Sequence, residues 1–275
     1  MTWQRIFRSI AVCMAAALLP LAAHSAGKCE RLVATGSPDA PPYLWRDPQD
    51  PERLIGVNAE LLQQAAAQVG VKVDVIYGGK RSQALEEVRS GRMDLLVDAP
   101  LTLAELESLD YVHPALVQND YLVWTLRSAP LEYRSLADLH GHTGAISAKA
   151  RPTQAFASLA AEHLNLLSTQ NLVQAFEKLL AGQVEYVIAG RYSGAATAQD
   201  QGVSDMLQTS ELPVDRPGLY LALSHDSACN DAWLRGQLAK KMTELAASGV
   251  PLEVFSRNVE RWKAQQLHPS AAPSQ

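Results

Sequence analysis

One pattern occurs twice in this sequence and constrains its fold more than any other feature. ALEEVRSGRMDLLVDA, which begins at Ala84, aligns without gaps on AFEKLLAGQVEYVIAG, which begins at Ala175. Each copy reads as a helix closed by glycine, then a turn that carries an acidic residue, then a buried strand. Such units are common in α/β proteins, so convergence is an alternative explanation. Because each copy also has its own surrounding βαβ pattern, the repeat favours two related α/β lobes.

Apolar periodicity predicts further elements around both copies. We expect helices over 57–70, 82–91, 230–249 and 251–262, and strands over 31–36, 71–77, 93–99, 121–126 and 218–224. Asn58 is a candidate cap for the first of these helices, and Gly70 is its expected stop. We expect the tail over 264–275 to be disordered.

The first 26 residues read as a secretory signal peptide. Arg5 and Arg8 form a charged start, IAVCMAAALLPLAA is apolar, and AHSA offers a cleavage site near Ser25 or Ala26. A membrane anchor is the alternative, but about 14 apolar residues fall short of the ~20 that span a bilayer. We therefore expect a soluble protein exported to the periplasm.

Charge and motifs exclude several classes of function. Removing the signal peptide takes away two arginines and no acid, so the formal net charge moves from −5 to −7. The sequence has no basic patch of the kind that nucleic-acid binding needs, so we expect no nucleic-acid partner. It contains no GxSxG, HExxH or Walker-type glycine loop, and we expect no cofactor.

Two cysteines, Cys29 and Cys229, remain after the signal peptide. An isolated pair in an oxidising compartment is more often bonded than free, which favours a disulfide, although two unrelated buried thiols are the alternative. A bond would tie the first strand to the start of a late helix and place both ends of the chain in one lobe.

The segment GSPDAPPYLW over 36–45 follows the first expected strand and contains three prolines. Proline fixes φ and removes a backbone donor, so the segment predicts a stiff, non-helical loop. Asp98 comes at the end of an expected strand, directly after MDLLV, and Arg191 follows the strand residues VEYVIA. Because ligands in open α/β sheets lie outside the carboxyl ends of the strands, we expect these three places to converge on one cleft.

The order and spacing of these motifs carry a family resemblance over roughly 30–262. They are SPDAPPY, then GVNAEL at a helix start, VRSGRMDLLV, SLADLHG, LLAGQVEYVI and the closing ELAASGVPLEVFSRNVERW. In this order the chain resembles the family 3 solute-binding proteins, the amino-acid receptors of ABC importers.

The resemblance implies two Rossmann-like lobes joined by a two-strand hinge, the type II architecture of periplasmic binding proteins. Lobe one would span 30–123 and 219–263, and lobe two 126–214. The disulfide would then lie within lobe one. The resemblance also implies a monomer that binds a small solute and partners an inner-membrane ABC permease.

Three contacts that the resemblance implies for amino-acid ligands are missing. The arginine that would hold the carboxylate is replaced by Glu105 or Leu106, depending on the alignment. Glu105 has a structural explanation, because Thr102 to Glu105 forms a capping box. The aspartate that would hold the ammonium is Gly190, and the stacking tyrosine is Ala40. The ligand should therefore differ from an α-amino acid.

Other polar residues could replace that set. The segment ISAKARPTQ follows a strand and precedes a helix, where backbone donors favour anions. Lys149 and Arg151 add positive charge to this segment. Arg81 and Arg191 would face the same cleft. Asp98 or Asp39 could bind a cationic or hydroxyl group of the ligand. Each lone charge could equally be a solvated loop residue. Our candidate ligand-binding residues are Ser37, Asp39, Tyr43, Arg81, Asp98, Lys149, Arg151, Thr153 and Arg191.

Three alternatives stay open. An enzyme similar to periplasmic cyclohexadienyl dehydratase, which shares this fold, would use Asp98, Asp39 or Glu105 as acid or base. Such an enzyme resembles the amino-acid receptors in keeping the arginine, which this chain lacks. A signalling receptor would contact a sensor kinase instead of a permease. A metal site would use the HGH sequence at 140–142 with His113 or His163, but no zinc-type spacing surrounds it, and we expect no metal.

Overall fold

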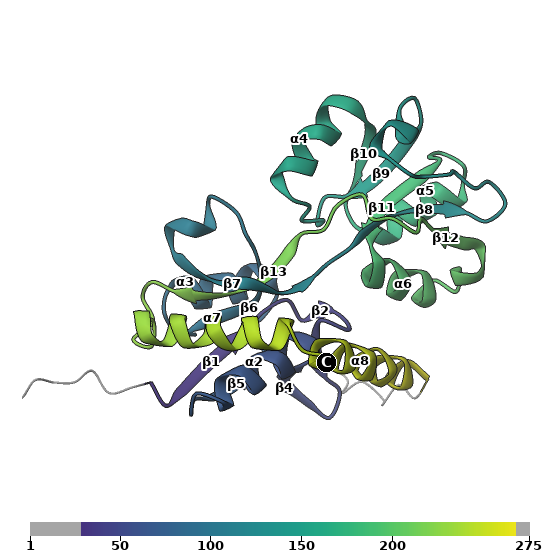
Figure 1. The fold of residues 1–275 in the computed structure, drawn as a ribbon. Helices are drawn as coiled ribbons and strands as arrows, with labels where there is room; N and C mark the ends of the chain where they lie inside the picture. The colour runs from purple at the N-terminus through teal and green to yellow at the C-terminus, as the bar shows by residue number, and fades with distance from the viewer. Residues whose placement is uncertain (1–28, 268–275) are drawn as a thin grey trace, which may run out of the picture.

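The computed structural model describes residues 29–267, which form two α/β lobes joined by two extended strands (Figure 1). The lobe-one sheet has the strand order β5-β1-β6-β13-β7. β1 pairs in parallel with β5 and β6, whereas β13 is antiparallel to β6 and β7. Its strands are β1 (Arg31–Thr35), β5 (Lys72–Val75), β6 (Leu95–Pro100), β7 (Leu109–Gln118) and β13 (Gly218–Ser224). Its helices are α2 (Val57–Ala67), α3 (Arg81–Arg89), α7 (Ala232–Ala246) and α8 (Val250–Leu267).

The lobe-two sheet has the order β10-β9-β11-β8-β12. Its strands are β8 (Tyr121–Leu126), β9 (Thr143–Ser147), β10 (Asn165–Thr169), β11 (Tyr186–Gly190) and β12 (Leu207–Thr209), and its helices are α4 (Gln154–His163), α5 (Leu172–Leu180) and α6 (Arg191–Asp200). The repeated unit is α3 with β6 in lobe one and α5 with β11 in lobe two. Both strands are buried along their whole length in the middle of their sheets. The two-lobed α/β prediction is therefore confirmed.

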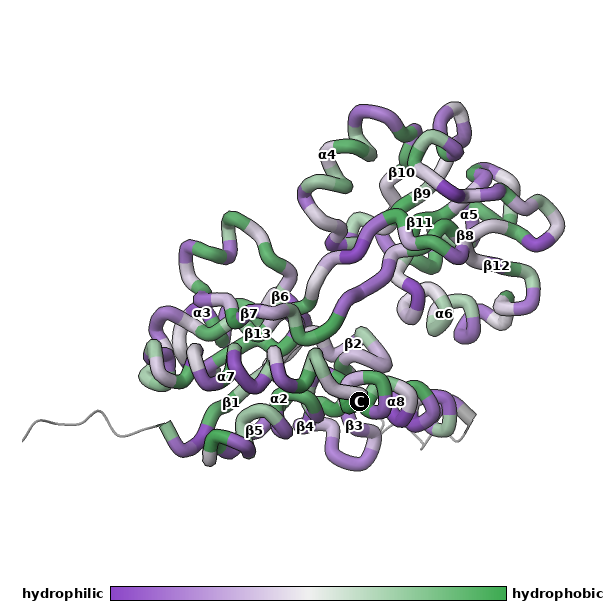
Figure 2. Tube along the Cα trace, in the orientation of Figure 1, coloured by the Kyte–Doolittle hydropathy of each residue, from purple (hydrophilic) through white to green (hydrophobic). Residues whose placement is uncertain are grey.

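Each lobe has its own hydrophobic core, visible as green strands and helices in Figure 2. Leu32, Leu61 and Leu95 pack in the lobe-one core and are fully buried. Phe176 and Tyr186 are fully buried on the two sides of the lobe-two sheet. Because these main cores lie within single lobes, each lobe is a packing unit of its own; a small cluster around Trp45 and Trp262, against which Ala196 packs, joins the two.

Two crossing segments, residues 118–121 and 215–218, connect the lobes. They run antiparallel, and the amides of Asn119 and Tyr121 donate to the carbonyls of Pro217 (3.0 Å) and Asp215 (2.9 Å). β7 ends in the first sheet at Gln118 and β8 begins in the second at Tyr121. The change of sheet thus falls at 119–120, whereas the resemblance implied a lobe-one end at residue 123, because β8 pairs with β11 from its first residue.

The proline-containing segment is non-helical, as predicted, but it is more ordered than a loop. It forms a small sheet of β2 (Asp39–Ala40), β3 (Leu44–Asp47) and β4 (Asp50–Ile55). The amide of Tyr43 donates to the Ala40 carbonyl at 2.9 Å and closes the turn between β2 and β3. The sequence did not reveal β2 and β3, because both are short and Pro38, Pro41 and Pro42 lie beside them, where prolines indicate a break in a strand.

Two predictions at helix ends are wrong. Asn58 is not a cap, since it lies in the first turn of α2, is fully buried, and donates from Nδ2 to the Val97 carbonyl at 2.9 Å. The expected disorder from residue 264 is contradicted over 264–267, because α8 continues to Leu267 and Gln265 Oε1 accepts from Trp45 Nε1 at 2.9 Å. The signal-peptide prediction and the tail over 268–275 fall outside the described residues.

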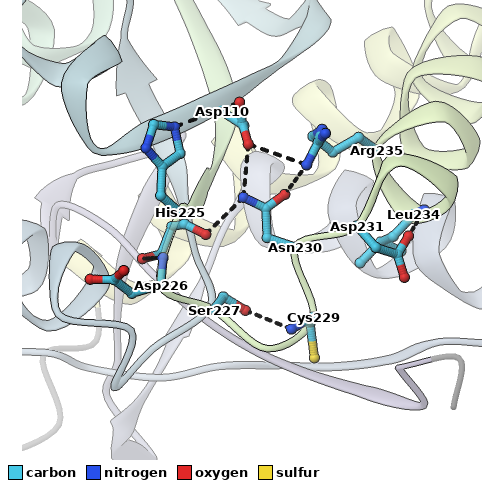
Figure 3. Close-up of polar contacts among 10 residues, drawn as sticks. Asp110, His225, Asp226, Ser227, Cys229, Asn230, Asp231, Leu234 and Arg235 are labelled. Carbon is cyan, nitrogen blue, oxygen red and sulfur yellow. Dashed lines mark hydrogen bonds and ion pairs between the residues drawn. The ribbon is translucent and has the colours of Figure 1, made fainter. Parts of the chain in front are cut away.

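The predicted disulfide between Cys29 and Cys229 is present, with Cα atoms 5.3 Å apart. It joins the residues before β1 to the turn that precedes α7. Figure 3 shows how this turn is held: Asn230 donates to the Asp110 carboxylate at 2.9 Å, and Arg235 pairs with the same carboxylate at 3.2 Å. Asp110 lies at the start of β7, so these contacts fix the turn to the end of the lobe-one sheet away from the crossing segments.

Tyr186 supplies a test of the lobe-two core. Its hydroxyl is buried and has no hydrogen-bond partner among residues 29–267, and burial raises its pKa to about 12 from 10.0. Replacing Tyr186 with Phe should therefore increase the free energy of unfolding by about 1 kcal/mol at neutral pH.

The folded protein holds the Tyr186 proton more tightly than the unfolded chain does. The associated stability is present below pH 10 and is lost as pH rises towards about 12, so Tyr186→Phe should also flatten that decline. Urea unfolding of both proteins at neutral pH and at about pH 11 measures this. Equal slopes for the two proteins would count against the assignment.

Candidate functional site

Three of the candidate residues meet at the lobe-one edge of the crossing. Ser37 follows β1, Asp98 lies in β6, and Arg81 is the first residue of α3. Asp98 is 4% exposed, and its Oδ2 accepts from the Ser37 amide at 2.9 Å and pairs with Arg81 Nη1 at 3.4 Å. Arg81 Nη1 also donates to Ser37 Oγ at 2.6 Å. This triad holds the Arg81 guanidinium in place at the carboxyl ends of the strands.

Gly36 makes room for the triad. A Cβ atom at this position would lie 2.6 Å from Asp98 Oδ1 and 2.6 Å from a methyl group of Leu44. Any side chain here would therefore displace the buried carboxylate. The glycine that ends the first strand is thus a packing requirement of the site.

The positive charge of Arg81 lies near two tyrosines, Tyr111 and Tyr121. Burial raises the pKa of Tyr121, the first residue of β8, and the positive charges of Arg151 and Arg81 oppose that rise. Burial likewise raises the pKa of Tyr111, again opposed by Arg81. Tyr121 lies at the end of the first crossing segment, and its hydroxyl accepts from the Arg151 amide of lobe two at 2.9 Å.

The segment over 147–153 forms the lobe-two edge. Arg151 donates its amide to the Tyr121 hydroxyl at 2.9 Å, while its Nη1 donates to the carbonyls of Ala148 (3.2 Å) and Ala150 (2.8 Å). The guanidinium of Arg151 thus folds over its own loop. Lys149 is exposed on the same loop, and its amide donates to Ser147 Oγ at 3.1 Å.

Thr153 caps α4 but does not face an open anion site. Its Oγ1 accepts from the Phe156 amide at 3.1 Å. Its amide and hydroxyl both donate to the Asp215 carboxylate, at 2.7 and 2.8 Å. Sequence reasoning missed Asp215, because it lies in the second crossing segment with no motif around it.

Arg191 lies in a different place, beside the crossing segments. Its amide donates to the Asp120 carbonyl at 2.8 Å, and its Nη2 pairs with Asp120 Oδ2 at 3.3 Å. Arg216 pairs with the other Asp120 oxygen at 3.0 Å. These residues border a cavity of about 310 Å³. Asp120 was also missed, since nothing in the sequence marked it as the partner of two arginines.

Tyr43 and Asp39 are not part of the triad. Tyr43 is 5% exposed, donates its hydroxyl to the Gln118 carbonyl at 3.1 Å, and packs edge-on against Tyr192 and Phe255. Its burial leaves little surface for a ligand. Asp39 is exposed and borders a separate cavity of about 620 Å³ between β2, α6 and α8.

Glu105, the residue that replaces the amino-acid-binding arginine in one alignment, has structural contacts. Its amide donates to Thr102 Oγ1 at 3.3 Å, and its Oε2 accepts from Thr102 and from the Tyr111 hydroxyl, at 3.2 and 3.0 Å. The carboxylate is therefore held by two hydroxyls at the short 3₁₀ turn over 105–107, and the hydroxyl of Thr102 also accepts from the first amide of that turn. Leu106, the residue in the other alignment, is 44% exposed.

The histidines of the HGH sequence do not converge on a metal position. His142 Nδ1 lies 2.8 Å from Glu185 Oε1, and the His140 ring packs near that of His163. His113 packs against Tyr220 instead. Over residues 29–267, no group of three or more His, Cys, Asp or Glu could hold a metal ion. None of the helices in this range is both long and apolar enough to cross a bilayer.

No protein-family model matches the sequence, and no curated protein matches it either. Solved structures do match. A histidine kinase sensor domain similar to periplasmic binding proteins has a TM-score of 0.61 at 19% identity, covering 84% of this chain and 96% of that one. The GluR0 ligand-binding core in complex with L-glutamate also scores 0.61, at 18% identity, covering 83% and 97%.

A third match is the amino acid ABC transporter substrate-binding protein AbpA from Streptococcus pneumoniae, bound to L-arginine. Its TM-score is 0.59 at 18% identity, with 84% of this chain and 95% of that chain covered. The fold is that of a type II periplasmic binding protein. In this periplasmic-binding-protein fold, the triad and the segment over 147–153 lie at the carboxyl ends of strands in opposite lobes, where open α/β sheets bind ligands.

Proposed function

We propose that this protein is a periplasmic receptor that closes its two lobes over a small polar solute and, as a monomer, delivers it to an inner-membrane ABC permease. The observation that carries the proposal is the arrangement around Tyr121. Arg151 of lobe two donates its amide to the Tyr121 hydroxyl, and Asp215 of the second crossing segment accepts from the Tyr121 amide. Arg81 is held at the lobe-one edge of the same crossing by Asp98 and Ser37. Rotation of the two lobes about the paired crossing segments would bring the polar groups at the two lobe edges closer together.

The proposed solute carries an anionic group that Arg81 holds. Ser37 and Asp98 engage one nitrogen of the guanidinium, and the side chain is 33% exposed. A guanidinium fixed in this way can offer its other donors to a carboxylate or phosphate with little loss of entropy. Arg81 would thus serve in place of the arginine that is absent at Glu105 or Leu106.

Binding is favoured over catalysis because the two acids nearest the triad carry structural contacts. Asp98 is paired with Arg81 and Ser37, and Glu105 with Thr102 and Tyr111. Asp98 Oδ1 has no hydrogen-bond partner among residues 29–267, but it is enclosed beside Gly36 and Leu44, and the carboxylate is held through Oδ2. A sensor role remains the second candidate, favoured by the likeness to a histidine kinase sensor domain. Uptake of the identified solute by cells that lack the protein distinguishes the two roles. Uptake should fall if the protein is an importer component and should stay unchanged if it is a sensor.

The test begins with native mass spectrometry of protein purified without denaturation, which should reveal a bound solute. Calorimetry with that solute should then show that Arg81→Lys lowers the affinity by about tenfold or more. A lysine keeps the positive charge beside Asp98 but lacks the two parallel N–H donors of the guanidinium. Arg92→Ala is the control, since Arg92 pairs with Glu87 on the surface of the same lobe. Unchanged affinity in Arg81→Lys, or no bound solute across a broad panel, would count against the proposal.

A further inference from the structure

Helix α4 begins at the cleft edge of lobe two and offers a position suited to an anion. It contains 10 residues and starts directly after Thr153. Amides at the start of a helix carry partial positive charge, and a hydroxyl beside them adds a donor. On sequence grounds this is where an anionic solute would bind lobe two.

The chain already supplies an anion there. The Asp215 carboxylate accepts from the Thr153 amide through Oδ2 at 2.7 Å and from the Thr153 hydroxyl through Oδ1 at 2.8 Å. Both of its oxygens are therefore engaged. Hydrogen bonds to a carboxylate are roughly twice as strong as neutral ones, so this arrangement resists displacement.

The backbone of Asp215 is fixed as well. Its carbonyl accepts from the Tyr121 amide at 2.9 Å across the two crossing segments. The Tyr121 hydroxyl in turn accepts from the Arg151 amide at 2.9 Å. Two amides near the start of α4, those of Arg151 and Thr153, are thus bound by groups on the crossing segments. A second carboxylate brought to this place would meet the negative charge of Asp215.

We infer that Asp215 is a specificity-determining residue, an internal carboxylate that fills the anion position of lobe two and excludes solutes that would bring an acidic group to it. The solute class is then a molecule whose anionic group faces Arg81 in lobe one and whose lobe-two end is uncharged or cationic. The solute class rests on the proposed receptor function. That Asp215 occupies the anion position can be tested without any solute.

The experiment uses acetate as a probe of the anion position. In ¹⁵N-labelled protein, the Thr153 amide resonance should not respond to acetate in the wild type. In Asp215→Ala it should shift saturably with acetate but not with acetamide, which has the same shape without the charge. Asp215→Ser provides a second opened position that keeps a polar side chain, in case the alanine variant folds poorly. Glu211→Ala is the matched control, because Glu211 is an exposed acid four residues before Asp215 in the same part of the chain. This variant should behave as the wild type.

Two results would overturn the inference. Saturable acetate binding at Thr153 in the wild type would mean that Asp215 gives way to an external carboxylate. No response in a folded Asp215 variant would mean that the start of α4 is not an anion position. Failure to find any solute would instead affect the receptor proposal alone, because the acetate result does not depend on it.

The solute class is tested by affinity once a solute is known. Opening the position should raise the affinity for an analogue with an added carboxylate at its uncharged end by about tenfold or more, the gain expected from one charge-assisted hydrogen bond. The wild type should bind the same analogue more weakly than the natural solute. Tighter binding of that analogue by the wild type would contradict the proposed class.

Discussion

Loss of the Cys29–Cys229 disulfide is expected to lower the free energy of unfolding by about 2–5 kcal/mol. The two cysteines are separated by 200 positions, so the bond closes most of the chain, including all of lobe two, into one loop. In the chain-entropy account, such a cross-link limits the unfolded ensemble more as the loop lengthens. The bond also holds the turn before α7 that Asp110 and Asn230 fix in Figure 3.

The measurement is urea unfolding of the wild type and of a variant carrying both Cys29→Ser and Cys229→Ser. A reducing agent should destabilise the wild type to the level of the variant and leave the variant unchanged. Equal stability of the oxidised wild type and the variant would show that the bond adds nothing to the free energy of unfolding. A response of the variant to the reductant would reveal an effect unrelated to this disulfide.

Tyr43→Ala is expected to lower the free energy of unfolding by about 3 kcal/mol, near the lower end for removal of a buried ring. Tyr43 is 5% exposed and packs against Tyr192 of α6 and Phe255 of α8, with ring centroids 5.6 and 5.7 Å away. It therefore joins the β2–β4 sheet, the C-terminal helix and lobe two. Its removal leaves a cavity where the two lobes touch beside the crossing segments.

Tyr43→Phe separates packing from hydrogen bonding. It keeps the ring and removes only the hydroxyl that donates to the Gln118 carbonyl, so the expected loss is about 1 kcal/mol. Chemical denaturation of the three proteins at neutral pH makes the comparison. If the alanine and phenylalanine variants were equally destabilised, the hydrogen bond and not the aromatic contact would dominate at this position.

Local pattern was sufficient for the elements of both lobes. Apolar periodicity marked α2, and the repeated helix–glycine–strand unit identified β6 and β11, which are the middle strands of their sheets. These features depend on which side of an element is buried, and the residues within that element encode this. The same reasoning failed for β2 and β3, because each is short and lies next to prolines that predict a loop. It failed for Asn58 because a polar residue at a helix start resembles a cap.

The sequence by itself therefore determined the two α/β lobes, the candidate cysteine pair and the individual polar residues at strand ends. Only the tertiary structure decided how these residues are partnered: Arg81 with Asp98, Arg191 with Asp120, and Thr153 with Asp215. Asp120 and Asp215 lie on the crossing segments, far in sequence from most of the groups they bind. The physical reason is that side-chain partners across the crossing depend on the register of two distant segments, which no local pattern of hydrophobicity or charge specifies.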